Sequence, residues 1–128
     1  MSQRAEKPTI LVVEDSFLIG MQLKEDLEDL GFAVAGPAPN VTSALHLIGD
    51  HELSCAVLDV NLGDEDSTPV GHVLLKAAIP FLFITGYASV AIDPDLFAEQ
   101  IVLNKPVEVG EIQQALLEMK PDLGSAAS

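Results

Sequence analysis

The sequence predicts an α/β domain of three layers, in which helices cover both faces of a five-stranded parallel sheet. Short apolar runs recur along the chain, several of them without polar alternation, and amphipathic patterns lie between them. Strands without polar alternation suit a sheet that is covered on both faces. Strands that alternate with helices form right-handed parallel units. The expected strands are residues 9–13, 33–35, 55–58, 81–84 and 101–103.

Helical spacing predicts three amphipathic helices and two shorter ones. Gly31 follows the first helix, where a glycine commonly ends one, and Asn40 is placed to cap the second. Weaker patterns predict short helices over residues 70–78 and 94–100. The three apolar stripes are Ile19, Leu23, Leu27 and Leu30; Val41, Ala44, Leu45 and Ile48; and Val109, Ile112, Leu116 and Met119.

Composition limits the class of protein. A chain of 128 residues suits one domain, expected over residues 8–120 between flexible ends at 1–7 and 121–128. No apolar run approaches the roughly 20 residues of a membrane span, and the N-terminus lacks the apolar segment of a secretory signal. With Cys55 as the single cysteine, expected in the core, a cytoplasmic protein is predicted. The net charge of −14 disfavours binding to nucleic acid.

Polar side chains follow four of the five expected strands. Each feature alone is most often an ordinary turn, but the carboxyl ends of parallel strands meet at one edge of the sheet. Three acids, a hydroxyl and an ammonium are therefore expected to converge there, which turn chemistry does not explain. The residues are Glu14-Asp15, Asp59, Thr85-Gly86 and Lys105-Pro106.

This combination of residue types predicts phosphoryl chemistry. Three neighbouring carboxylates repel one another unless a cation joins them, and Mg²⁺ (or Mn²⁺) prefers oxygen ligands. Glu14, Asp15, Asp59 and the backbone carbonyl of Asn61 are the expected ligands. Asp59 is the expected nucleophile toward phosphorus. Thr85 is expected to donate a hydrogen bond and Lys105 a positive charge to the phosphoryl oxygens.

These motifs resemble the receiver domains of two-component response regulators, over about residues 8–120. The resemblance rests on the acid pair, on Asp59 in "LDVN", on Thr85 with a small residue after it, and on Lys105-Pro106. It implies a flavodoxin-like sheet of strand order 2-1-3-4-5. It also implies that Asp59 accepts a phosphoryl group from a phosphohistidine of a histidine kinase or phosphotransfer protein. The Lys105-Pro106 bond is commonly cis in the family, and the backbone at Asn61 and Gly86 is expected to bind the phosphoryl group.

The sequence also departs from the family pattern. Many receivers carry an aromatic residue three positions before the lysine, which moves inward with the threonine. Here that position holds Val102, so the resemblance does not carry the threonine–aromatic switch over to this chain. Instead "FITGYA" resembles the FATGUY receivers, often stand-alone proteins that pair with HWE and related histidine kinases. Thr85, Tyr87, Val102 and Pro106 are the candidate switch residues.

The segment after the fourth strand predicts a second route for switching. Residues 88–100 are poorly helical and contain Pro94, so phosphorylation is hypothesised to order residues 86–100. Tyr87 is the only tyrosine. It is read first as a half-buried ring and, as a sharper hypothesis, as a gate of the site.

Two other functions compete with a signalling module that is not an independent enzyme. A small haloacid-dehalogenase-like phosphatase also uses a strand-end aspartate, Mg²⁺, threonine and lysine. It needs a second aspartate where this chain has Asn61. A degenerate receiver acting as an unphosphorylated scaffold is the third class. For the leading interpretation, the expected partner surface is the first helix together with Tyr87 through Lys105, on a monomer or weak dimer.

Overall fold

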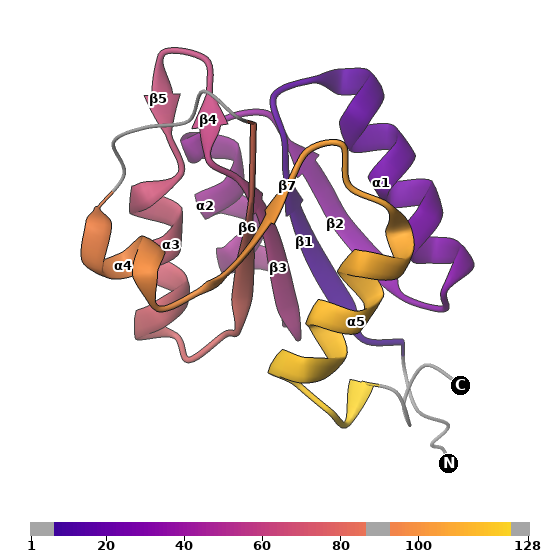
Figure 1. Ribbon diagram of the computed structural model, residues 1–128. Helices are drawn as coiled ribbons and strands as arrows, with labels where there is room; N and C mark the ends of the chain where they lie inside the picture. The colour runs from indigo at the N-terminus through magenta and orange to yellow at the C-terminus, as the bar shows by residue number, and fades with distance from the viewer. Residues whose placement is uncertain (1–6, 87–92, 124–128) are drawn as a thin grey trace.

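The computed structural model describes residues 7–86 and 93–123, which form one parallel sheet with helices on both faces (Figure 1). The strand order β2-β1-β3-β6-β7 is the expected 2-1-3-4-5 order once a separate two-stranded hairpin, β4–β5, is set aside. Four of the five predicted strands run further than the apolar pattern indicated. The strands are β1 Thr9–Val13, β2 Ala33–Ala38, β3 Cys55–Asp59, β6 Phe81–Thr85 and β7 Ile101–Asn104.

The helices form the outer two layers. α1 (Phe17–Asp29) and α5 (Val109–Met119) cover one face of the sheet. α2 (Val41–Asp50), α3 (Thr68–Lys76) and α4 (Pro94–Ala98) cover the other face. In Figure 1 these two groups of helices lie on opposite sides of the strands. The predicted three-layer architecture is therefore confirmed.

The central strand β3 explains why the apolar runs lack polar alternation. Cys55 and Val57 pack in the cluster that includes α1 and α5, whereas Ala56 and Leu58 pack in the cluster under α2, α3 and α4. All five residues of β3 are buried. Each large apolar side chain buried in this way contributes about 1.5–3 kcal/mol. An apolar residue is thus favoured at every position until the strand reaches Asp59.

Local signals in the sequence set the helix ends. The Asn40 side chain accepts a hydrogen bond from the Ser43 backbone N–H at 2.8 Å, as a cap of α2 should. After α1, Gly31 adopts φ +103°, a conformation that residues with a Cβ rarely take. Both predicted end signals are confirmed.

Two apolar stripes differ from the prediction at one position each. Ile19 and Leu45 are 43% and 37% exposed, although the helical spacing placed them in the core. In α1 the buried face passes instead through Gly20, where a Cβ would lie 2.7 Å from the Cβ of Pro37 on β2. The glycine lets α1 approach β2 closely, and this turns Ile19 outward.

The chain also departs from the prediction at two places outside the main sheet. No strand was predicted between residues 58 and 70, but the chain there forms the hairpin of β4 (Asn61–Leu62) and β5 (Glu65–Asp66). Beyond the predicted boundary at 120, Leu123 is buried in the core. None of the helices in the described ranges is long and apolar enough to cross a membrane.

Candidate functional site

Strand register brings the polar residues to one edge of the sheet. Val13 pairs with Leu58, so the residues that follow them, Glu14 and Asp59, lie side by side. Thr85 pairs with Asn104 on β7, the residue before Lys105. The parallel pairing of β1, β3, β6 and β7 therefore brings all the predicted residues to one edge, where the acids and Lys105 meet but the Thr85 hydroxyl does not.

The three acids form a compact cluster. One carboxylate oxygen each of Glu14, Asp15 and Asp59 lies within 4.8 Å of the other two. Glu14 and Asp59 are buried, at 2% and 4% exposure, whereas Asp15 is exposed. Hard oxygen donors at this spacing suit a divalent cation such as Mg²⁺, which takes carboxylates together with water.

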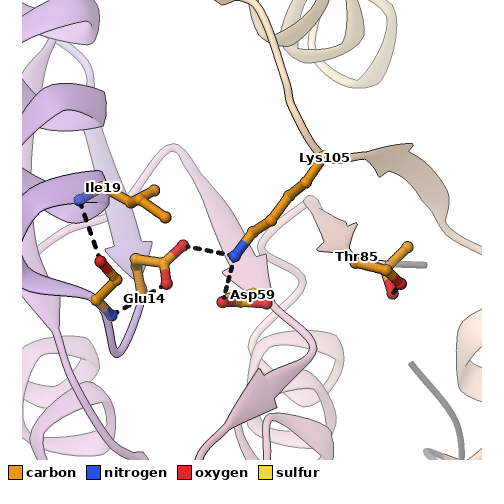
Figure 2. Close-up of polar contacts among 7 residues, drawn as sticks. Glu14, Ile19, Asp59, Thr85 and Lys105 are labelled. Atoms are coloured by element: carbon orange, nitrogen blue, oxygen red, sulfur yellow. Dashed lines mark hydrogen bonds and ion pairs between the residues drawn. The ribbon is translucent and has the colours of Figure 1, made fainter. Parts of the chain in front are cut away.

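Lys105 is the counter-charge of the buried acids (Figure 2). Its ammonium donates to Oδ2 of Asp59 at 3.0 Å and lies 3.4 Å from Oε1 of Glu14. Burial lowers the pKa of Lys105, but the hydrogen bond to Asp59 and the charges of Asp59 and Glu14 outweigh it and raise the pKa above its usual value. Lys105 therefore stays protonated and holds together the carboxylates at the ends of β1 and β3.

Glu14 is buried beside a second acid, and Lys105 offsets only part of the cost of charging it. Burial, followed by contact with the Asp59 carboxyl, raises the pKa of Glu14 from 4.5 to about 7. The Ser16 backbone N–H, which donates to Oε2 of Glu14 at 3.1 Å, and Lys105 act in the opposite direction. A divalent cation would relieve the same electrostatic cost, so the residues present fit a metal ion.

Thr85 lies apart from this cluster. Its hydroxyl donates to the Gly86 carbonyl at 3.0 Å, and Figure 2 shows it turned away from Asp59 and Lys105. A Cβ added at Gly86 would meet no atom within 4 Å among the described residues. Within residues 7–86 and 93–123, nothing therefore crowds the position next to Thr85.

The remaining predicted residues are placed as follows. Asn61 is exposed at the start of β4, immediately after the site. Val102 is partly buried against the core under α2, α3 and α4. The Lys105-Pro106 peptide bond is cis, as the resemblance implied. Tyr87 lies outside the described residues, so its two predicted roles stay predictions.

The chain is similar to several proteins of known structure. SdrG from Sphingomonas melonis Fr1 is 38% identical over 88% of this chain and 96% of its own, with a TM-score of 0.77. A BeF3-activated conformation of SdrG, attributed to Pseudomonas melonis Fr1, is 41% identical over 85% of this chain and 95% of its own, with a TM-score of 0.71. A response regulator from Burkholderia pseudomallei, with a phosphorylated aspartic acid and a calcium ion, is 26% identical over 93% of this chain and 70% of its own. Its TM-score is 0.76.

Among the curated proteins, the phyllosphere-induced regulator PhyR of Methylorubrum extorquens is 35% identical over 81 residues, 61% of this chain. The chain spans 30% of the length of that relative. Solved receiver domains of response regulators at 22–23% identity share the fold. The chain belongs to the response-regulator receiver domains. No protein-family model matches it.

The receiver has two features near the site that the sequence did not reveal. Phe17 and Leu18, at the start of α1, are 73% and 79% exposed, and Met21 one turn later is 38% exposed. In the hairpin, the Glu65 carboxylate reaches α2 and accepts a hydrogen bond from the Val41 backbone N–H at 3.0 Å. Gly63 and Asp64 form the two-residue turn between β4 and β5, and a Gly-Asp pair is a local sequence signal for such a hairpin.

Proposed function

We propose that this receiver accepts a phosphoryl group on Asp59 from a phosphohistidine and thereby changes its protein contacts. The observation that carries the proposal is the position of the Asp59 carboxylate. It is 4% exposed at the end of β3, bonded to Lys105 at 3.0 Å and adjacent to the acid pair. A rigid strand end aims this carboxylate at the open edge of the sheet.

The transfer is a displacement at phosphorus. A carboxylate oxygen of Asp59 bonds to phosphorus as the P–N bond to the imidazole breaks, and the electron pair of that bond returns to the nitrogen. Lys105 keeps its proton and its charge faces the phosphoryl oxygens. Thr85 would rotate from the Gly86 carbonyl to donate to a phosphoryl oxygen, and the Gly86 backbone N–H would add a donor.

Glu14, Asp15, Asp59 and the Asn61 carbonyl would hold a divalent cation, which we propose is Mg²⁺, with Mn²⁺ as a substitute. When bound, such an ion neutralises charge on the carboxylates and on the phosphoryl oxygens. The spacing of the three carboxylates, with one oxygen of each within 4.8 Å of the others, supports this assignment, and a cation would offset the cost of burying charge that raises the pKa of Glu14. We propose no separate enzymatic activity beyond this self-catalysed transfer.

The partner is proposed to dock on the first turn of α1 and across to the segment after β7. The exposed apolar residues Phe17 and Leu18 lie two and three positions after Asp15. Between α1 and residues 105–107 lies a cavity of about 580 Å³, lined mainly by apolar side chains with Glu14 and Lys105 beside them. The second half of α1 is acidic, which favours a partner helix with basic residues.

The kinase is proposed to belong to the HWE or a related group. This rests on the "FITGYA" resemblance to FATGUY receivers and on the absence of an aromatic residue at Val102.

Leu18→Glu tests the docking surface. It should slow transfer from the kinase while phosphorylation by acetyl phosphate continues at the wild-type rate. Equal losses with both donors would contradict the docking surface.

Intact mass after incubation with acetyl phosphate tests the central proposal. The wild type should gain one phosphoryl group in the presence of Mg²⁺ and none in its absence, and Asp59→Asn should gain none. A gain that persists in Asp59→Asn would refute the assignment of the acceptor. If the wild type gains nothing from either acetyl phosphate or a phosphorylated kinase, the chain is a scaffold of the degenerate class.

A further inference from the structure

The hairpin β4–β5 begins almost at the acceptor. A single residue, Val60, separates Asp59 at the end of β3 from Asn61 in β4. Asn61 pairs with Asp66 and Leu62 pairs with Glu65. In Figure 1 the hairpin stands beyond the carboxyl ends of the sheet. The position of the hairpin therefore fixes the peptide that follows the acceptor, including the Asn61 carbonyl proposed as a metal ligand.

Two contacts hold the base of the hairpin. The Ser67 backbone N–H donates to the Val60 carbonyl at 3.0 Å, and the Leu62 side chain is buried in the core under α2 and α3. The turn is held less directly. A Cβ placed at Gly63 would lie 4.0 Å from Oδ2 of Asp15, so the turn faces the exposed metal-binding acid.

Glu65 links this hairpin to a helix far away in the sequence. Its Oε2 accepts from the backbone N–H of Val41, the first residue of α2, at 3.0 Å and across 24 positions of the chain. Asn40 satisfies a different donor of that helix end, the N–H of Ser43. A carboxylate at a helix N-terminus is stabilised both by the free N–H groups and by the helix dipole. Glu65 is therefore placed to anchor the turn end of the hairpin.

We propose that Glu65 is a positioning residue for the cation and phosphoryl site: by binding the N-terminus of α2 it holds Asn61 and Gly63 against Asp59 and Asp15. This inference rests on the proposed function. Mutation of residues that orient metal ligands without touching the metal typically lowers metal affinity by about 10–100-fold. Because this hydrogen bond is exposed, about a threefold to tenfold loss of affinity is expected here.

The test measures Mn²⁺ binding to the metal-free protein from the electron paramagnetic resonance signal of free Mn²⁺. Glu65→Ala should lower the affinity for Mn²⁺ about threefold to tenfold. It should also raise the rate of amide hydrogen exchange across residues 61–66 before any metal is added. Glu65→Gln keeps an acceptor oxygen without the charge and should recover most of the wild-type affinity. Asp64→Ala removes a carboxylate from the same exposed turn and should leave both measurements unchanged.

A variant at the other end of the hydrogen bond gives an independent check. Val41→Pro deletes the donor N–H at the first helical position, where proline is well tolerated, and the extended Asn40 (φ −152°, ψ 174°) suits a following proline. It should reproduce the Glu65→Ala effect. The double variant should be no weaker than either single variant, because both remove one interaction.

The outcomes separate this proposal from the one it rests on. Wild-type protein that binds no Mn²⁺ would overturn the proposed function and the positioning role with it. Wild-type binding together with unchanged Mn²⁺ affinity and unchanged exchange in Glu65→Ala would overturn only the positioning role. Equal weakening in Glu65→Ala, Glu65→Gln and Asp64→Ala would also overturn it, since the cause would be net charge alone.

Discussion

The two halves of the site are organised differently. On the β1–β3 side, Glu14 and Asp59 are buried and joined by the ammonium of Lys105, which reaches them from the end of β7, at 3.4 Å and 3.0 Å. On the β6–β7 side, the Thr85 hydroxyl bonds only to the neighbouring Gly86 carbonyl among the contacts of the described residues. The acid side is thus built before any phosphoryl group arrives, whereas the threonine side has a side chain that can turn. We infer that binding is pre-organised on the first side and that the response begins on the second.

Removal of Lys105 should have the largest effect on stability. Lys105→Met leaves Asp59 and Glu14 buried together without a counter-charge, and breaking such a pair costs about 2–4 kcal/mol after allowance for the partial exposure of Lys105. Chemical denaturation at pH 8 without divalent ions measures the loss. Saturating Mg²⁺ should recover part of it. A free energy of unfolding equal to that of the wild type would show that the acid side is not held by this contact.

Protonation of Glu14 should give the acid side a pH dependence. Its pKa in the folded protein, about 7, lies above the ordinary value of 4.5. The folded state therefore binds this proton more tightly, and the stabilisation is complete below pH 4.5 and lost as the pH rises through 7. The loss is on the order of 1–3 kcal/mol.

The melting temperature of Glu14→Gln relative to wild type, measured without metal from pH 4.5 to 8.5, isolates this contribution. The melting temperature of the variant should rise relative to that of the wild type as the pH increases. A difference that stays constant over this range would contradict the raised pKa.

Two glycines test whether the helices beside each half are equally rigid. Gly20→Ala forces a Cβ to 2.7 Å from the Pro37 ring and should cost about 1–3 kcal/mol, because the ring cannot move aside. Gly71→Ala would place a Cβ 2.9 Å from a terminal methyl of Leu96 in α4 and in ordinary contact with the Phe81 ring, and it should cost less than about 1 kcal/mol because only the end of one side chain has to shift. Gly110→Ala, with no atom within 4 Å among the described residues, is the control and should be neutral or stabilising. Equal losses of stability in Gly20→Ala and Gly71→Ala would show that the two helices do not differ in rigidity.

Thr85→Val should change stability least, by less than about 0.5 kcal/mol, because within the described part of the chain its hydroxyl bonds only to the neighbouring Gly86 carbonyl. The same variant should slow phosphorylation by acetyl phosphate, because the proposed donor to the phosphoryl oxygen is lost. Thermal unfolding and the rate of mass gain measure the two effects separately. A large drop in stability would mean that Thr85 supports the fold.

The fold and the members of the site could be predicted because each depends on short-range patterns. Strands buried on both faces require continuous apolar runs, and parallel pairing then brings Asp59 and Lys105 to one edge without further information. The burial of Cys55 and the cap at Asn40 follow from the same local rules. The Asp59–Lys105 contact is in this sense encoded by strand order.

Other features could not be predicted because they depend on contacts between distant segments. Strands of two residues, as in the β4–β5 hairpin, are too short to give a periodic pattern. The Glu65–Val41 contact joins positions 24 apart, and nothing local to Glu65 indicates its partner. Ile19 was misplaced because the close approach of Gly20 to Pro37 decides which face of α1 is buried. The hypothesis that phosphorylation orders residues 86–100 stays a prediction; residues 94–98 already form α4, and 87–92 lie outside the described residues.

The irregular end of β2 has a consequence for the protein at high concentration. An open sheet has two edge strands, and unpaired edges are templates for strand addition between molecules. In β2, Pro37 has no N–H to donate and the pairing with β1 shifts between Leu11 and Val13. β7 has no proline and keeps a regular register with β6. Intermolecular sheet extension, and any aggregation that follows from it, would therefore start at β7 rather than at β2.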